Sequence, residues 1–141
     1  MFQLEEDDFS VRAAHTVHAQ PLLAAAYRID SDRGSIVFTG DTEPVDSVVE
    51  LARGADMLVC MCWDTDAAME AEGLSGGMTG TPSAATLAAQ AGVRTLVLTH
   101  IGPNLDRPSA REKGLRDAAA VFDGTIVFGE ELQVLEVAGS S

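Results

Sequence analysis

The pattern of hydrophobic and polar positions changes about a third of the way along the chain. Up to residue 40 it consists of short apolar runs separated by polar, turn-forming residues. These runs predict strands over residues 9–18, 22–30 and 35–40. The polar stretch SDRG between the second and third runs predicts a hairpin turn.

Beyond residue 40, segments with helix signals alternate with continuous apolar runs. Thr42 and Thr81 stand where helix N-caps are expected, and Gly54 and Gly92 stand where helices end. We predict helices over residues 42–55, 81–92 and 107–122, with a connection over 64–80 that is helical in part. We predict strands over residues 56–63 and 93–100, and two more within 124–137.

The order of these elements is β-β-β-α-β-α-β-α-β-β. Strands that follow a helix and read as unbroken apolar runs are typical of a sheet buried on both faces. We therefore predict an α/β (α+β) fold, with a mixed sheet, helices packed on one face, and a single domain over residues 1–141.

Charge bears on possible partners. The 141 residues contain 22 Asp and Glu against 9 Lys and Arg, a formal net charge of −13. This charge repels phosphate backbones, and no cluster of Lys or Arg offsets it, which argues against nucleic acid as a partner. No apolar run reaches the roughly 18–20 residues of a membrane span. The acidic first ten residues differ from the basic start of a secretory signal, so we expect a cytoplasmic protein.

The two cysteines are two residues apart, in the run LVCMCW. On a strand, Cys60 and Cys62 would project from the same face and could not form an ordinary disulfide with each other. We interpret them as buried thiols that pack as small apolar residues. A metal-binding role has weak support, because the chain lacks a CxxC spacing.

Two polar residues with metal-binding side chains follow predicted strands. Asp41 comes directly after SIVFTG, and His100 ends the run TLVLTH. Loops beyond strand ends are where functional groups gather in alternating folds, so one carboxylate and one imidazole could share a divalent metal here. Two simpler roles stay open: Asp41 could brace a turn or cap a helix, and His100 could be hydrogen-bonded at a strand end.

Several motifs together resemble a known family. The chain contains FTGDT, then ADMLV, then a helix entered through MTGTP, then AGVRTLVLTH. In this order they resemble the C-terminal half of the metallo-β-lactamase superfamily, in the branch of tRNA 3′-processing endonucleases and arylsulfatase-like hydrolases. The resemblance covers about residues 9–137 and includes a histidine, His18, ahead of the pair Tyr27-Arg28.

The resemblance implies half of an αβ/βα sandwich and a site for one or two metals, usually zinc. The aspartate of GDT and the histidine of LTH are metal ligands in that family, which assigns Asp41 and His100 to the metal. Thr42 and Thr99 would support these ligands, and His18 would contact substrate or support the site. The implied reaction is hydrolysis of an ester or phosphodiester by metal-activated water.

The sequence also departs from the family pattern. The HxHxDH motif is absent, and Gly77 stands where related sequences carry a histidine before MTGT, which predicts a flexible Gly76-Gly77 loop. Catalytic zinc sites use three protein ligands. We therefore expect the chain alone to bind zinc weakly or not at all. His15, three residues before His18, is interpreted as structural.

These departures set the expected partners and the alternatives. We expect a small-molecule ester or phosphodiester substrate, and either a homodimer or the missing N-terminal half on the open face of the sheet. The main alternative is a non-catalytic oligomerisation or scaffold module that retains remnants of the metal site. A flavodoxin-like nucleotide module would require GGMTGT as its phosphate loop, but this stretch lacks the Walker lysine.

Overall fold

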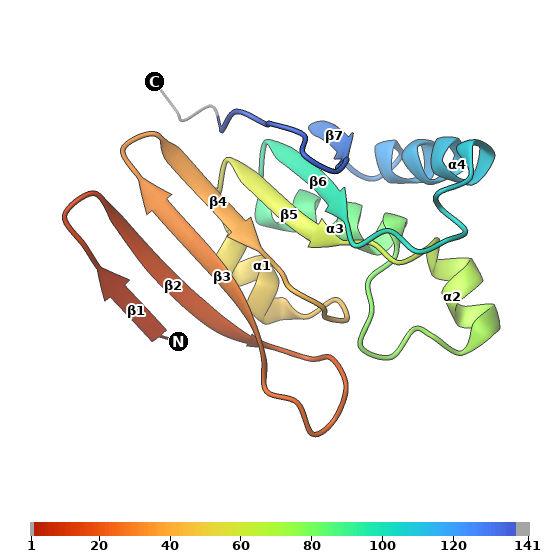
Figure 1. Cartoon of the computed structure of the whole chain (residues 1–141), viewed down its shortest axis with the longest axis horizontal. Helices are drawn as coiled ribbons and strands as arrows, with labels where there is room; N and C mark the ends of the chain where they lie inside the picture. Colours follow the sequence, from red (N-terminus) through yellow and green to blue (C-terminus); the bar gives the residue numbers. More distant parts are fainter. Residues whose placement is uncertain (1, 138–141) are drawn as a thin grey trace.

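A computed structural model of the chain describes residues 2–137. Its seven strands form one sheet, in which the spatial order β1 to β7 is the order along the chain (Figure 1). Strands β1 to β4 pair antiparallel, and β4 to β7 pair parallel. The strands are β1 (Phe2–Glu5), β2 (Phe9–Thr16), β3 (Ala24–Ser31), β4 (Gly34–Phe38), β5 (Met57–Met61), β6 (Thr95–Thr99) and β7 (Thr125–Phe128).

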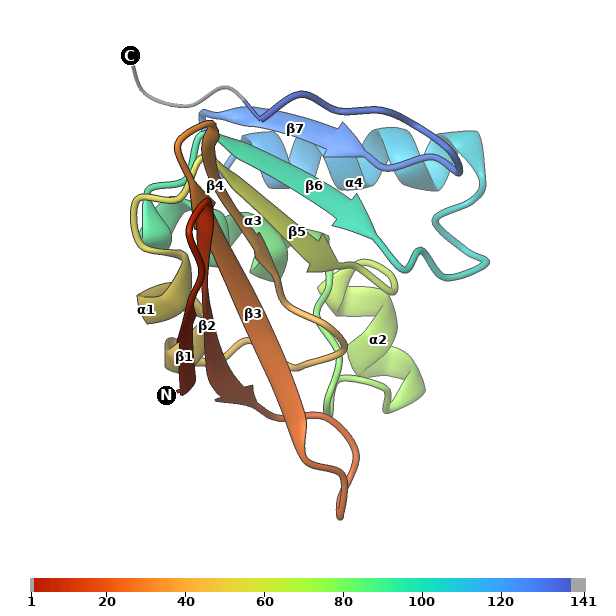
Figure 2. The same cartoon turned by 60° about the vertical axis from the view of Figure 1, so that its left-hand side comes forward.

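Helices α1, α3 and α4 lie on one face of this sheet, and α2 lies beyond the end of β5 (Figures 1 and 2). Parallel strands added in one direction, each through a right-handed crossover, place every connecting helix on the same side. Helix α1 packs on β2 to β4, α3 packs on β5 and β6, and α4 packs on β7 and α3. The helices are α1 (Asp46–Ala52), α2 (Asp66–Glu72), α3 (Thr81–Ala91) and α4 (Pro108–Ala119).

The mixed sheet and its one-sided helix layer confirm the predicted fold class. The helical part of the predicted 64–80 connection is α2. Two predictions about strands are wrong. The acidic N-terminal segment forms β1, which the sequence pattern did not indicate. Only one strand forms within 124–137, since residues 131 and 132 lie in a turn and residues 133–137 pair with no strand.

Both predicted N-caps are also wrong. The N-cap of α1 is Val45, which makes no side-chain capping bond, and Thr42 lies before the helix. The N-cap of α3 is Gly80, so Thr81 is the first helical residue instead. The predicted end of α3 is confirmed, because Gly92 adopts the left-handed conformation that terminates a helix.

The core lies between the helices and the sheet. Leu58, Leu96 and Leu98 are fully buried there. Cys60 and Cys62 are free and completely buried in the same cluster, which confirms the interpretation of both as packing residues. Among the described residues, no helix has the length and hydropathy that are needed to cross a membrane.

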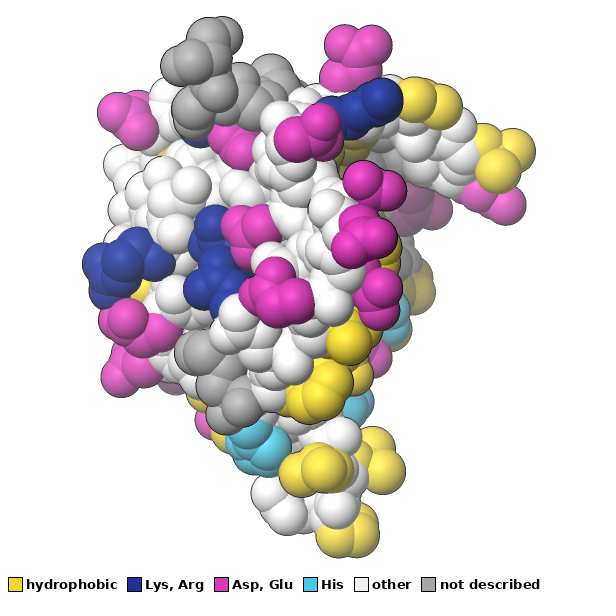
Figure 3. Space-filling model, turned by 90° about the vertical axis from the view of Figure 1, so that its left-hand side faces the viewer, with side chains coloured by type: hydrophobic (Ala, Val, Ile, Leu, Met, Phe, Trp, Pro, Cys, Tyr) yellow, Lys and Arg dark blue, Asp and Glu magenta, His cyan; other side chains and the backbone are white. Residues whose placement is uncertain are grey.

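The part of the sheet beyond α1 carries an ion cluster on its helix side. Asp30 accepts hydrogen bonds from Arg12 at 2.9 Å and from Arg28 at 2.8 Å. Arg28 also donates to the carbonyl oxygens of Leu51 and Arg53, so it binds the C-terminal end of α1 to β3. Figure 3 looks at the β1 side of the molecule and shows basic and acidic side chains together toward the left, with hydrophobic side chains along the right-hand margin.

Candidate metal centre

The structure brings Asp41 and His100 together. Strands β4 and β6 both pair parallel with β5, so their carboxyl ends meet at one edge of the sheet. His100 Nε2 lies 3.7 Å from Asp41 Oδ2. Both side chains are close to half exposed, at 46% and 42%, so a ligand from solvent can reach them.

The backbone has a positive φ at two positions on this edge, one after β4 and one after β6. Gly40, just before Asp41, has φ = +61°, and its missing Cβ leaves room for the carbonyl oxygen of Ala25. His100 itself has φ = +52°, a left-handed conformation that costs a residue with a side chain about 1–2 kcal/mol. Strain of this kind gathers at functional sites, so the conformation of His100 points to a role beyond packing.

An aromatic side chain supports His100. The Trp63 ring lies 5.6 Å from the imidazole, centroid to centroid, with 40° between the two planes. Gly102 donates its N–H to the Trp63 carbonyl oxygen at 2.9 Å, and a Cβ at Gly102 would lie only 2.4 Å from that oxygen. Sequence reasoning missed Trp63, although it follows β5 just as Asp41 follows β4. The rule of strand ends, applied to β5, would have found it.

The loop after His100 is tied to the loop after β5. Asp64 is buried, and its Oδ1 accepts hydrogen bonds from Asn104 Nδ2 at 2.9 Å and from the Thr65 backbone N–H at 2.7 Å. The loop that leaves His100 is thereby fixed by Gly102 at one point and by Asn104 at another.

Thr42 and Thr99 both lie beside the pair. Thr42 is fully buried; its Oγ1 donates to the Glu43 carbonyl oxygen, and its own carbonyl oxygen accepts from Thr79 Oγ1, each at 2.7 Å. Thr99 is half-buried and lines the same hollow as Asp41 and His100. Neither threonine is hydrogen-bonded to Asp41 or His100, so their assignment as supporting residues stays a prediction.

His18 is fixed by the GGMT loop. Its Nδ1 donates to the Gly77 carbonyl oxygen at 2.7 Å, while the Gly77 N–H donates to Glu43 Oε2 at 3.0 Å. Gly77 is buried with φ = +76°, and a Cβ there would lie 2.9 Å from the His18 backbone. The predicted flexible loop at Gly77 is therefore wrong, because this peptide is held on both sides. Glu43 was not expected from the sequence.

Asp41 and His100 open onto a hollow of about 180 Å³. It is lined by Phe38, Thr39, Gly40, Asp41, Val59, Met61, Thr99 and His100. Asp41 and His100 are its titratable lining residues, and most of the others are apolar. His15 lies on β2 with an exposed side chain and does not line this hollow.

The donor set fits part of a metal site. A carboxylate oxygen and an imidazole nitrogen are both good zinc ligands, and 3.7 Å is a separation that one cation can bridge. Catalytic zinc sites use three protein ligands. Within residues 2–137 there is no group of three or more His, Cys, Asp or Glu side chains placed to hold a metal.

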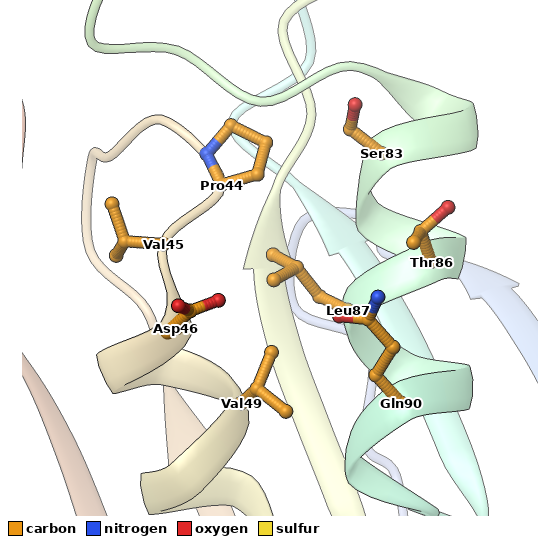
Figure 4. A pocket seen from close by; sticks show the side chains of 8 residues that line it. All are labelled: Pro44, Val45, Asp46, Val49, Ser83, Thr86, Leu87 and Gln90. Atoms are coloured by element: carbon orange, nitrogen blue, oxygen red, sulfur yellow. The ribbon is translucent and has the colours of Figure 1, made fainter.

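A second hollow, of about 210 Å³, lies between α1 and α3 (Figure 4). Val49 and Leu87 face each other across it, and Pro44 and Ser83 stand at one end. Asp46 is its one titratable lining residue. This hollow shares no lining residue with the one at Asp41 and His100 and lies in the helix layer.

Comparison with known proteins places the chain in a family. Residues 1–101 match the model of the beta-lactamase superfamily domain. Ribonuclease Z of Mycobacterium tuberculosis (strain ATCC 25618 / H37Rv) is 35% identical over 138 residues, which is 94% of this chain and 50% of that protein. The chain therefore belongs to the beta-lactamase superfamily. It spans about half the length of the curated relatives it matches.

Solved structures agree on the fold. The metallo-beta-lactamase fold protein YhfI from Bacillus subtilis superposes with a TM-score of 0.76 at 25% identity, covering 92% of this chain and 50% of that chain. Human tRNase Z, short form, superposes with a TM-score of 0.72 at 22% identity, covering 95% and 44%. The seven-stranded sheet with its helices is therefore the fold of one part of these proteins.

These relatives overturn the expected partner. We expected a small-molecule ester or phosphodiester substrate, and the net charge argued against nucleic acid, but the relatives in question are named ribonuclease Z and tRNase Z. The expectation failed because the net charge of the whole chain was used to judge whether it binds RNA. Binding to RNA depends on the local field at the contact surface, and half of the relatives' length lies outside this chain.

Proposed function

We propose that this chain supplies two metal ligands and one β-layer of a zinc-dependent hydrolase that cleaves phosphodiester bonds in RNA. The observation that carries the proposal is the pair Asp41 and His100, 3.7 Å apart at one sheet edge, in a chain 35% identical to a ribonuclease Z along nearly its whole length. We propose the cytoplasm as its place of action.

The roles of individual residues follow from their contacts. Asp41 and His100 would hold the cation, His100 through a neutral imidazole nitrogen. When bound, a divalent cation lowers the pKa of a coordinated water and stabilises negative charge on a phosphoryl oxygen. Trp63 packs beside the imidazole and limits its rotation. The Gly40 turn and the anchored Thr42 fix the carboxylate from both sides along the chain.

The remaining ligands would come from outside the described residues. This supports a site shared between two halves of a domain, because two donors alone leave a zinc site incomplete. The alternative of a scaffold module accounts less well for His100. The positive φ of His100, +52°, together with its position 3.7 Å from a half-exposed carboxylate, favours a role in binding.

The experiment uses a chimera in which the N-terminal half of the Mycobacterium tuberculosis ribonuclease Z precedes this chain. The zinc-loaded chimera should cleave a tRNA transcript that carries a 3′ extension. Asp41→Ala and His100→Ala should each lower the rate at least 100-fold. Asp123→Ala, which removes an exposed carboxylate in the turn between α4 and β7, should leave it within twofold. A folded, zinc-loaded chimera that cleaves no RNA, or cleaves it equally well without Asp41, would overturn the proposal.

A further inference from the structure

His100 is held in its strained conformation by the segment that follows β5. A positive φ such as its +52° costs free energy and persists only where the surrounding structure enforces it. Two backbone hydrogen bonds flank the residue. On one side the Cys62 N–H donates to the Thr99 carbonyl oxygen at 2.7 Å. On the other side the Gly102 N–H donates to the Trp63 carbonyl oxygen at 2.9 Å, so the chain is fixed both before and after His100.

The loops after β5 and β6 meet a third time through two polar side chains. Figures 1 and 2 show these loops leaving the sheet side by side. Asn104 Nδ2 donates to Asp64 Oδ1 at 2.9 Å, and the Thr65 backbone N–H donates to the same oxygen at 2.7 Å. Asp64 is only 5% exposed. Because burial of a carboxylate is costly unless its hydrogen bonds are satisfied, the bond from Asn104 is needed to keep this group inside the protein.

The Trp63 indole connects this contact with the imidazole. A Cβ at Gly102 would lie 3.0 Å from Cδ2 of the indole, so the backbone of the loop passes directly over the ring. The same ring lies 5.6 Å from the His100 imidazole, centroid to centroid. Only Pro103, whose φ is fixed by its own ring, separates Gly102 from Asn104. A loop that is closed at Asn104 therefore holds the indole beside the imidazole.

The loop has a separate attachment to the fold. Leu105 is fully buried in the hydrophobic core, and α4 begins three residues later, at Pro108. The core contact of Leu105 keeps the chain on the fold, whereas the bond from Asn104 sets the course of residues 100–104 ahead of it. A change at Asn104 is therefore expected to alter the position of the imidazole more than the stability of the chain.

We propose that Asp64 is a positioning residue of the metal centre. By accepting the hydrogen bond from Asn104, it closes the loop that carries His100 and keeps the imidazole beside Asp41 before the cation binds. A ligand that is already in place loses less conformational freedom on binding, and partners that orient a metal ligand commonly change metal affinity by about 10- to 100-fold. The inference rests on the proposed function for the role of His100 as a ligand.

The first measurement needs no metal. In the chain alone, with EDTA present, nuclear Overhauser effects between indole protons of Trp63 and imidazole protons of His100 report the contact of the two rings. Asn104→Leu cannot donate the hydrogen bond and should reduce these effects at least threefold. Asp64→Asn should leave them unchanged, because its amide oxygen can still accept both hydrogen bonds.

The second measurement is the zinc affinity of the metal-free chimera, determined by isothermal titration calorimetry. Asn104→Leu should weaken binding at least tenfold, whereas Asp64→Asn should stay within threefold of the parent chimera. Asp106→Ala is the matched control for both measurements, because it removes an exposed carboxyl from the same loop and should change neither quantity. The unfolding midpoint of each variant is measured alongside. A merely structural contact would lower the midpoint and leave the zinc affinity of the folded protein unchanged.

A second variant covers the case in which Asn104→Leu alone does not fold. That substitution leaves the buried carboxylate of Asp64 without one of its partners, and an unpaired buried charge is strongly destabilising. The double variant Asp64→Asn/Asn104→Leu has no charge at this position and still lacks the hydrogen bond between the loops. It should therefore fold and show the same losses in ring contact and in zinc affinity.

Three outcomes would overturn the proposal. One is an unchanged contact between the two rings in a folded variant without the hydrogen bond. Another is full zinc affinity of the chimera although that contact is lost. The third is a loss of either quantity in Asp106→Ala as large as in Asn104→Leu. A folded parent chimera that binds no zinc would instead remove the proposed function, and the metal-free measurement would still decide whether Asp64 positions the imidazole.

Discussion

The His18 Nδ1 donates a hydrogen bond to the Gly77 carbonyl oxygen at 2.7 Å, although 59 residues separate the two in the chain. This bond fixes the loop that leads into α3 against the loop that follows β2, and the bond from the Gly77 N–H to Glu43 fixes it against the connection between β4 and α1. The positive φ of Gly77 and its contact with the His18 backbone leave no room for a side chain.

Gly77→Ala is therefore expected to destabilise the chain by at least about 2 kcal/mol, through backbone strain and the displaced His18 contact. Urea unfolding followed by circular dichroism measures the change. Gly76→Ala is the matched control, because nothing lies within 4 Å of a Cβ at Gly76, and it should change stability by less than about 0.5 kcal/mol. Equal effects of the two substitutions would contradict the described geometry.

The ion cluster on β2 and β3 makes stability depend on pH. Partial burial by itself raises the pKa of Asp30, but hydrogen bonds from Arg28 and Arg12 outweigh it, so the pKa lies below its usual 3.8. A carboxyl whose pKa is lowered by folding stabilises the fold above the unfolded-state value, and the stabilisation is lost as pH falls through the folded-state value.

Asp30→Asn should therefore lower the melting temperature at pH 7, and the difference from the parent chain should shrink as pH falls below about 4. Thermal melts at a series of pH values provide the measurement. Asp32→Asn, at an exposed carboxyl in the β3–β4 turn, is the control and should show no such trend. A difference that stays constant down to pH 2.5 would show that the Asp30 charge does not stabilise the fold.

Both cysteine thiols should be inert in the folded chain. Burial raises the pKa of Cys60 to about 12, and burial also raises that of Cys62. Since the thiolate is the reactive form, labelling by a thiol reagent at pH 8 should proceed at the rate of unfolding and should accelerate sharply in denaturant. Fast labelling of the native chain at either position would contradict its burial.

The raised pKa of Cys60 also makes the stability of the chain depend on pH in the alkaline range. A thiol whose pKa is raised by folding contributes stability that is present below its unfolded value, near 9, and is lost as pH rises toward the folded value of about 12. Cys60→Ala removes this titration. Its unfolding free energy should therefore fall less steeply between pH 9 and pH 11 than that of the parent chain, in denaturant titrations at each pH.

The sequence pattern was sufficient to predict the features that neighbouring residues in the chain determine. Helix α3 ends at Gly92, as predicted, because glycine adopts the left-handed conformation at a helix end without steric cost, so the signal is local. Asp41 and His100 could be paired because parallel strands bring their carboxyl ends to one edge. Trp63 belongs to the same edge and could have been found by the same rule.

Other features depend on contacts between residues far apart in the sequence, which no local pattern can predict. Glu43 meets Gly77 across 34 residues, and no local pattern marks that contact. The apolar residues within 130–137 predicted a second strand, but residues 133–137 pair with none of the described strands. Thr42 was expected to cap a helix, yet its backbone and hydroxyl are used in contacts with neighbouring loops. The net charge says nothing about where charge is placed, which is why it failed to indicate the substrate class.

The most direct test of the account is zinc binding by the metal-free chimera, measured by isothermal titration calorimetry. We expect tight binding that weakens at least tenfold in Asp41→Ala and in His100→Ala and is unchanged in Asp123→Ala. Zinc bound with full affinity by a folded chimera that lacks Asp41 or His100 would contradict the central claim that this pair belongs to the metal centre.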